Sequence, residues 1–85
     1  MHIELRFFAG VREALGTASE RVELPPEIDT VGAVRKFLCA RGGIWADTLA
    51  DKRVLRMAYD QVMTTADAPI IDGGEVAFFP PVTGG

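Results

Sequence analysis

The sequence predicts a single α+β domain in which one main helix packs on one face of a mixed β-sheet. Three observations carry this prediction: two alternating segments near the N-terminus, one strong helical stripe in the middle, and three short strand-like segments after it. This order of elements is typical of domains in which a helix covers one side of a sheet. At 85 residues the chain is long enough for one such domain and too short for two.

The N-terminal third predicts two strands joined by a short connection. Residues 2–8 carry buried-type apolar side chains at every second position, which is the period of a half-buried strand. Residues 11–15 fit a short helical turn. Residues 19–24 alternate again and stop at Pro25 and Pro26, which predicts the second strand.

The strongest helix signal follows Thr30. Threonine is a favoured N-cap, because its hydroxyl can accept a hydrogen bond from a free backbone N–H of the first turn. The apolar stripe that follows consists of Val31, Val34, Phe37 and Leu38. Gly42 and Gly43 are expected to end this helix.

The C-terminal half predicts three more strands. Residues 45–49 are ambiguous, whereas residues 54–59 and 61–64 read as short strands. A turn at residues 72–74 leads into a last strand over residues 75–79. Because a single helix covers one face only, the other face of the sheet must be solvated or meet a partner.

Composition excludes several classes of protein. Nine basic and twelve acidic residues give a formal net charge of −3, which argues against non-specific nucleic-acid binding. Charged residues interrupt the N-terminal apolar stretch, so it lacks the form of a secretory signal, and no apolar run is long enough to span a membrane. The single cysteine cannot form an internal disulfide. We therefore expect a cytoplasmic protein without a nucleic-acid or membrane partner.

Catalytic and metal-binding patterns are absent from the sequence. His2 is the only histidine, so a histidine-based triad or metal site is not expected. Cys39 lies within the predicted helix, where we interpret it as a small packing residue. The aspartates fall in turn-like segments, where their side chains serve local hydrogen bonds: Asp47, Asp51, Asp60, Asp67 and Asp72. The chain resembles a substrate of enzymes more than an enzyme.

Two pairs of adjacent phenylalanines bear on the open face of the sheet. If Phe7 and Phe78 point at the helix, alternation sends Phe8 and Phe79 to the other side. With Met63 they would form an exposed apolar patch suited to protein contact. The alternative is that a β-bulge or the strand ends place both rings inside.

The last six residues predict an extended arm on the domain of residues 1–79. This tail consists of Pro80, Pro81, Val82, Thr83, Gly84 and Gly85. The prolines cannot continue strand pairing and favour an extended exit. The glycines carry no side chain, so the end of the chain can enter a narrow channel with its carboxylate accessible. A frayed terminus or an expression remnant is the alternative.

Two segments carry a family resemblance. DGGEVAFFPPVTGG at residues 72–85, together with FFA-x-VRE at residues 7–13, resembles the small subunit of molybdopterin synthase, also called molybdopterin converting factor subunit 1. The resemblance covers essentially the whole chain, and it implies the ubiquitin-like β-grasp fold.

The resemblance also implies a chemistry for the tail. In that family an adenylating enzyme uses ATP to activate the terminal glycine carboxylate, which sulfur then converts to a thiocarboxylate. Carried over, Gly85 is the reactive residue and Gly84 the slim spacer behind it. No permanently bound cofactor is implied. The implied partners are the large subunit, in a heterotetramer, an E1-like adenylating enzyme and a sulfur-donating protein.

The same resemblance assigns contacts with partners. Phe8, Met63 and Phe79 would dock, Pro80, Pro81, Val82 and Thr83 would carry the tail into the partner, and Arg12 is a candidate polar contact. The chain departs from the family at Asp60, where asparagine is common, and at Gly74, where an acidic residue is expected and glycine should only loosen the turn. A sulfur carrier for thiamine thiazole synthesis and a ubiquitin-like protein modifier remain as alternatives.

Overall fold

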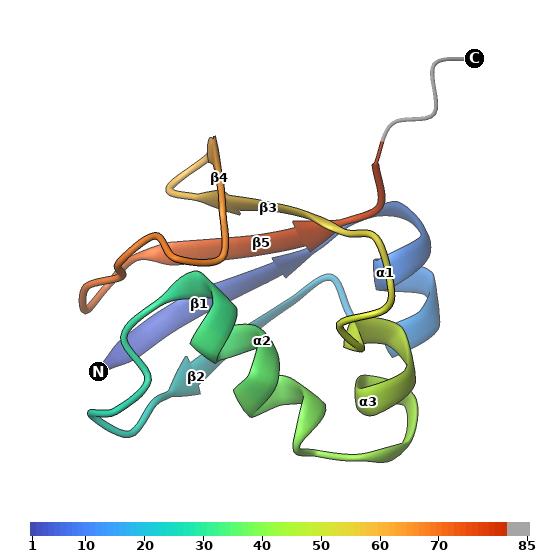
Figure 1. Cartoon of the computed structure of the whole chain (residues 1–85), viewed down its shortest axis with the longest axis horizontal. Helices are drawn as coiled ribbons and strands as arrows, with labels where there is room; N and C mark the ends of the chain where they lie inside the picture. Colours follow the sequence, from blue (N-terminus) through green and yellow to red (C-terminus); the bar gives the residue numbers. More distant parts are fainter. Residues whose placement is uncertain (82–85) are drawn as a thin grey trace.

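The computed structural model describes residues 1–81 and contains one five-stranded sheet (Figure 1). The strands lie in the order β2-β1-β5-β3-β4. The central pair β1–β5 is parallel, and the other three pairs are antiparallel. The elements along the chain are β1 (His2–Phe7), α1 (Ala9–Leu15), β2 (Ser19–Glu23), α2 (Val31–Cys39), α3 (Gly43–Leu49), β3 (Arg56–Tyr59), β4 (Val62–Thr64) and β5 (Glu75–Phe79). The predicted α+β class and mixed sheet are confirmed.

The core lies between the helices and one face of the sheet. Its fully buried side chains come from the two central strands, from α2 and from α3: Ile3, Leu5, Phe7, Val76, Phe78, Val31, Val34, Leu38 and Leu49. The hydroxyl of Thr30 accepts a hydrogen bond from the N–H of Ala33, so the predicted N-cap of α2 is present. The alternating sequence pattern of β1 and β5 therefore correctly predicted which of their side chains face the core.

The predicted main helix is α2, and the ambiguous stretch of residues 45–49 belongs to a further helix, α3. Gly42 and Gly43, interpreted as helix breakers, do follow α2, but Gly42 is also the N-cap of α3. Both have positive φ values, 78° and 53°, which glycine adopts at little cost, so the chain reverses here and starts a second helix. Trp45 of α3 packs edge-on against Phe7, with 5.7 Å between ring centroids, and Leu49 is fully buried. Tertiary packing decides this helix.

The turn between β3 and β4 explains the aspartate at position 60. Asp60 and Gln61 both have positive φ, which is the two-residue hairpin geometry that asparagine, aspartate and glycine favour. The carboxylate of Asp60 accepts a hydrogen bond from the N–H of Glu75 at 2.9 Å, and its own N–H donates to the carbonyl of Glu75 at 2.8 Å. This side chain therefore joins the hairpin to the start of β5.

The expectation for Gly74 was wrong. Gly74 is buried, and a Cβ placed there would lie 2.3 Å from the hydroxyl of Tyr59 and 2.6–2.7 Å from its ring. That hydroxyl accepts a hydrogen bond from the N–H of Ile71, which holds the ring in place. Glycine is thus favoured here by close approach of the tyrosine, and an acidic side chain would not fit without moving the ring.

Within residues 1–81, no helix has the length and apolar character needed to cross a membrane.

Candidate docking face

Parallel pairing of β1 with β5 brings the two phenylalanine pairs together. Phe7 lies opposite Phe78 in the register, and both are buried beneath the helices. The next residues, Phe8 and Phe79, meet at the end of the two strands with their rings edge to face and their centroids 6.2 Å apart. Phe8 is 44% exposed and Phe79 is half-buried. The alternative that both rings are tucked inside is wrong for Phe8.

The open side of the sheet continues this apolar surface toward β4. Ala77 of β5 lies opposite Ala58 of β3, which lies opposite Met63 of β4. Both alanines are buried, and Met63 is 57% exposed. We call the five residues Phe8, Ala58, Met63, Ala77 and Phe79 the docking face. The structure thus joins the three predicted docking side chains through two alanines that the sequence analysis did not single out.

Arginines border the docking face at the end where the tail leaves. Arg6 lies opposite Ala77, and Arg56 lies opposite Phe79. Arg12, in the last turn of the short helix α1, donates its backbone N–H to the carbonyl of Phe8 at 3.3 Å. All three side chains are exposed, and none forms an ion pair with another residue of the described chain. This end of the face is therefore positively charged, although the whole chain carries a net charge of −3.

The tail begins where the sheet ends. β5 stops at Phe79, and Pro80 and Pro81 follow as half-buried residues without strand pairing. Val82, Thr83, Gly84 and Gly85, the other predicted tail residues, lie outside the described part of the chain. The first tail residue thus leaves the domain beside the Phe8–Phe79 pair.

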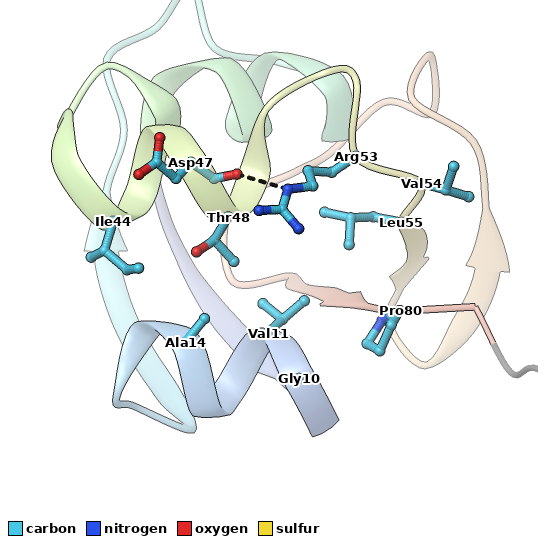
Figure 2. Close-up of a pocket in the computed structure, with 10 residues that line it drawn as sticks. All are labelled: Gly10, Val11, Ala14, Ile44, Asp47, Thr48, Arg53, Val54, Leu55 and Pro80. Carbon is cyan, nitrogen blue, oxygen red and sulfur yellow. Dashed lines mark hydrogen bonds between the residues drawn. The ribbon is translucent and has the colours of Figure 1, made fainter.

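A groove lies beside the start of the tail, with Pro80 among its lining residues (Figure 2). It has a volume of about 430 Å³ and is bounded by α1, α3, the segment before β3, and the start of the tail. We call it the tail-side groove, and its lining residues are Gly10, Val11, Ala14, Ile44, Asp47, Thr48, Arg53, Val54, Leu55 and Pro80. The sequence analysis missed this groove, because its residues come from four separate segments and show no common pattern.

Buried Arg35 of α2 holds one wall of the groove. Its Nε donates to the carbonyl of Leu49 at 2.7 Å, and its Nη2 donates to the carbonyls of Ala50 and Arg53 at 2.6 and 2.9 Å. These carbonyls belong to the end of α3 and the loop after it, where free carbonyls and the helix dipole favour a cation. Arg35 therefore sets the position of the segment that enters β3.

Cys39 has a packing role, as the sequence predicted. Its thiol contacts the carbonyl of Leu49 at 3.2 Å, close to the carbonyls that Arg35 binds. Burial raises the pKa of the Cys39 thiol, so the unreactive protonated form is favoured at neutral pH.

Comparison with known proteins identifies the family. The model of the ThiS family matches residues 5–85. The molybdopterin synthase sulfur carrier subunit of Escherichia coli (strain K12) is 45% identical over 83 residues, which span 98% of this chain and 99% of that protein. The chain belongs to the family of molybdopterin synthase sulfur carrier subunits. A second curated carrier subunit, from Haemophilus influenzae, is 37% identical over 83 residues with the same coverage.

A solved structure agrees with the fold expected for a sulfur carrier subunit. In a complex of subunits 1 and 2 of the molybdopterin-converting factor from Helicobacter pylori 26695, the matching chain superimposes with a TM-score of 0.68. The two chains cover each other completely and are 22% identical. At that identity the likeness concerns the fold alone, which is the ubiquitin-like β-grasp that the resemblance implied.

Proposed function

We propose that this chain carries sulfur for molybdenum cofactor synthesis on its C-terminal Gly85. The observation that supports the proposal most is the 45% identity, over nearly full length, with a curated sulfur carrier subunit of molybdopterin synthase. The sequence ends in Gly-Gly after two prolines, and the described chain ends its last strand immediately before them. Gly85 therefore follows the last residue of β5 by six positions in the sequence.

The chemistry needs activation because a carboxylate is a poor electrophile. The Gly85 carboxylate attacks the α-phosphorus of ATP on an E1-like adenylating enzyme, which releases pyrophosphate and forms an acyl-adenylate. Hydrosulfide, supplied by a sulfur-donating protein, then attacks the acyl carbon and displaces AMP. With hydrosulfide the products are the thiocarboxylate, AMP and a proton. ATP is consumed as a substrate of the partner enzyme and is not a cofactor of this chain.

The thiocarboxylate then acts in the large subunit of molybdopterin synthase. Its sulfur is a soft nucleophile, ionised at neutral pH, that attacks a cyclic pterin precursor held in the large subunit. Water then cleaves the bond between the Gly85 acyl carbon and the sulfur, which leaves the sulfur on the pterin and returns Gly85 as a carboxylate. Two such transfers build the dithiolene of molybdopterin, which is consistent with a heterotetramer of two carriers and two large subunits. The carrier itself is a sulfur-donating, non-catalytic subunit, and we place this pathway in the cytoplasm.

The docking face fits a partner that receives the tail. Its exposed side chains, Phe8 and Met63, are apolar, and the partly covered ring of Phe79 lies directly before the arm. Apolar groups at the centre of an interface supply most of its affinity, and a charged rim gives orientation. Arg6, Arg12 and Arg56 would form that rim, so the matching surface on the partner should be acidic.

Intact mass tests the proposal. The chain is incubated with the adenylating enzyme of the same organism, ATP and sulfide, beside a variant that lacks Gly85. We expect the full-length chain to gain the mass of one oxygen-to-sulfur exchange and the truncated chain to stay unchanged. An unchanged full-length chain, with an enzyme shown to be active on another carrier, would contradict the proposal.

A second step separates the molybdopterin pathway from the two alternatives. The thiocarboxylated chain is mixed with the large subunit and the cyclic pterin precursor. Formation of molybdopterin supports the proposal. Sulfur transfer to a thiazole precursor instead, or isopeptide bonds between Gly85 and lysines of other proteins, would replace it with the thiamine or the modifier alternative.

A further inference from the structure

The tail-side groove and the docking face meet at the base of the tail. Pro80 lines the groove and directly follows Phe79 of the docking face. Gly10 lines the groove two residues after Phe8. A partner that covers Phe79 and Pro80 therefore lies next to both surfaces.

The groove has the chemistry of a protein contact site. Five of its lining residues have apolar side chains: Val11, Ala14, Ile44, Val54 and Leu55. Two of them stand at the rim, where Ile44 is 48% exposed and Val54 is 76% exposed. Concave apolar surface bordered by exposed apolar side chains is characteristic of binding sites.

One positive charge faces the inside of the groove. The Nε of Arg53 donates to the backbone carbonyl of Asp47 at 3.2 Å, and Figure 2 shows the guanidinium turned toward Thr48 and Leu55. The carboxylate of Asp47 points away from the groove in the same view. Arg53 forms no ion pair with the described residues. A carboxylate entering the groove could therefore pair with two guanidinium N–H groups.

The groove is formed before any partner arrives. Three hydrogen bonds from Arg35 hold the end of α3 and the carbonyl of Arg53 itself. The opposite wall, α1, is anchored by Val11, which is 3% exposed. A preformed site loses less conformational entropy on binding than a flexible one.

We propose that the tail-side groove binds a segment of the large subunit of molybdopterin synthase that carries a large apolar side chain beside a carboxylate. This inference rests on the proposed function, which supplies the partner. A stable protein interface takes about 20–30 residues from each side, far more than the five of the docking face. The groove is the adjoining apolar surface at the tail, and Arg53 adds a positive charge to it.

A second copy of the chain does not offer a matching segment. Among the described residues, Ile71 is the one exposed large apolar side chain with an acidic residue next to it. That residue, Asp72, already accepts a hydrogen bond from the N–H of His2 at 2.6 Å. Inserting Ile71 and Asp72 of one copy into the groove of another would break this bond.

Substitutions on the two walls test the proposal without touching the core. Ala14→Phe fills the groove from an exposed position, Val54→Ala removes its most exposed rim side chain, and Arg53→Gln removes its charge. The matched controls are Ile71→Ala, at an equally exposed apolar residue on the turn before β5, and Lys52→Gln, a neighbouring charge outside the groove. Binding to the large subunit of the same organism is measured by calorimetry at low and high salt, and denaturant unfolding verifies that each variant is folded.

We expect Ala14→Phe and Val54→Ala to raise the Kd about tenfold, the loss typical of a buried interface side chain. Arg53→Gln should weaken binding at low salt and reduce its salt dependence more than Lys52→Gln does. Ile71→Ala should bind like the wild type.

Each other outcome overturns the proposal in a recognisable way. If all three groove variants bind the large subunit as tightly as the wild type does, the groove lies outside the interface. In that case the proposed function still stands, provided that the wild-type chain is thiocarboxylated at Gly85 and binds the large subunit. Failure of the wild-type chain both to bind and to be thiocarboxylated would remove the proposed function itself. An effect of Ala14→Phe on self-association in sedimentation, or on the adenylating enzyme alone, would assign the groove to a different occupant.

Discussion

Replacing Phe8 by alanine tests the docking face most directly. An isolated phenylalanine offers roughly 200 Å² of surface, and the 44% exposure of Phe8 therefore leaves roughly 90 Å² for a partner to cover. At about 25 cal/mol per Å², covering this area contributes roughly 2 kcal/mol to binding, which corresponds to about a 30-fold change in Kd. We expect Phe8→Ala to weaken binding of the large subunit by about this factor.

The variant also loses an internal contact, which has to be measured separately. The edge-to-face contact of Phe8 with Phe79 contributes about 1 kcal/mol, so the free energy of unfolding should fall by about that amount. Calorimetric titration with the large subunit and urea unfolding are therefore carried out on the same samples. Ile71→Ala is the control, because Ile71 is 69% exposed on the turn that precedes β5.

One result would refute the reasoning about the docking face. If Phe8→Ala remains folded and changes the Kd no more than Ile71→Ala does, Phe8 is not covered by the large subunit. Strong loss of binding by Ile71→Ala as well would show that exposed apolar area, rather than the docking face, decides the affinity.

Three predictions concern stability. Gly74→Ala should lower the free energy of unfolding by about 1–3 kcal/mol because its Cβ displaces Tyr59, as urea unfolding will show. The control is Gly10→Ala, which should not destabilise the fold, because a Cβ at Gly10 meets open space and its φ is not positive. Arg35→Met should lower the free energy of unfolding by about 2–4 kcal/mol, because three carbonyls lose their hydrogen-bond donor. Lys36→Met, at the exposed neighbouring position, is the control. Equal unfolding curves for the two variants would contradict this role of Arg35. The hydrogen-bonded ion pair with Arg41 holds the pKa of Glu20 below its ordinary value of about 4.3. The pair therefore stabilises the fold fully at pH values above the ordinary pKa, and this contribution is lost as the pH falls through the lowered pKa. Unfolding followed from pH 6 to pH 3 should therefore show a smaller loss in Glu20→Gln than in the wild type, and parallel losses would argue against the pair.

Local patterns were enough for the strands and for α2. Alternation depends only on neighbouring residues, so it correctly separated the buried Phe7 and Phe78 from Phe8 and Phe79. The cap at Thr30 is likewise local, because its hydroxyl bonds to an N–H three residues further along the chain. The tail of residues 80–85 is also visible in sequence alone, since it is a linear order of residue types.

Helix α3 and the need for glycine at position 74 depended on distant residues. Two glycines look like the end of a helix, and only the contact of Trp45 with Phe7, 38 positions earlier, makes the following stretch helical. At Gly74 the deciding neighbour is the ring of Tyr59. Neither contact leaves a trace in the local pattern.

The sequence by itself determined the side of the sheet on which each strand residue lies, the main helix, and the chemical nature of the tail. These follow from the periods of strand and helix and from the restricted backbone of proline and the freedom of glycine. Only the tertiary structure decided that Phe8 and Phe79 meet, because their contact requires parallel pairing of strands at opposite ends of the chain. It alone also formed the tail-side groove, since four separate segments come together there around a wall that buried Arg35 holds in place.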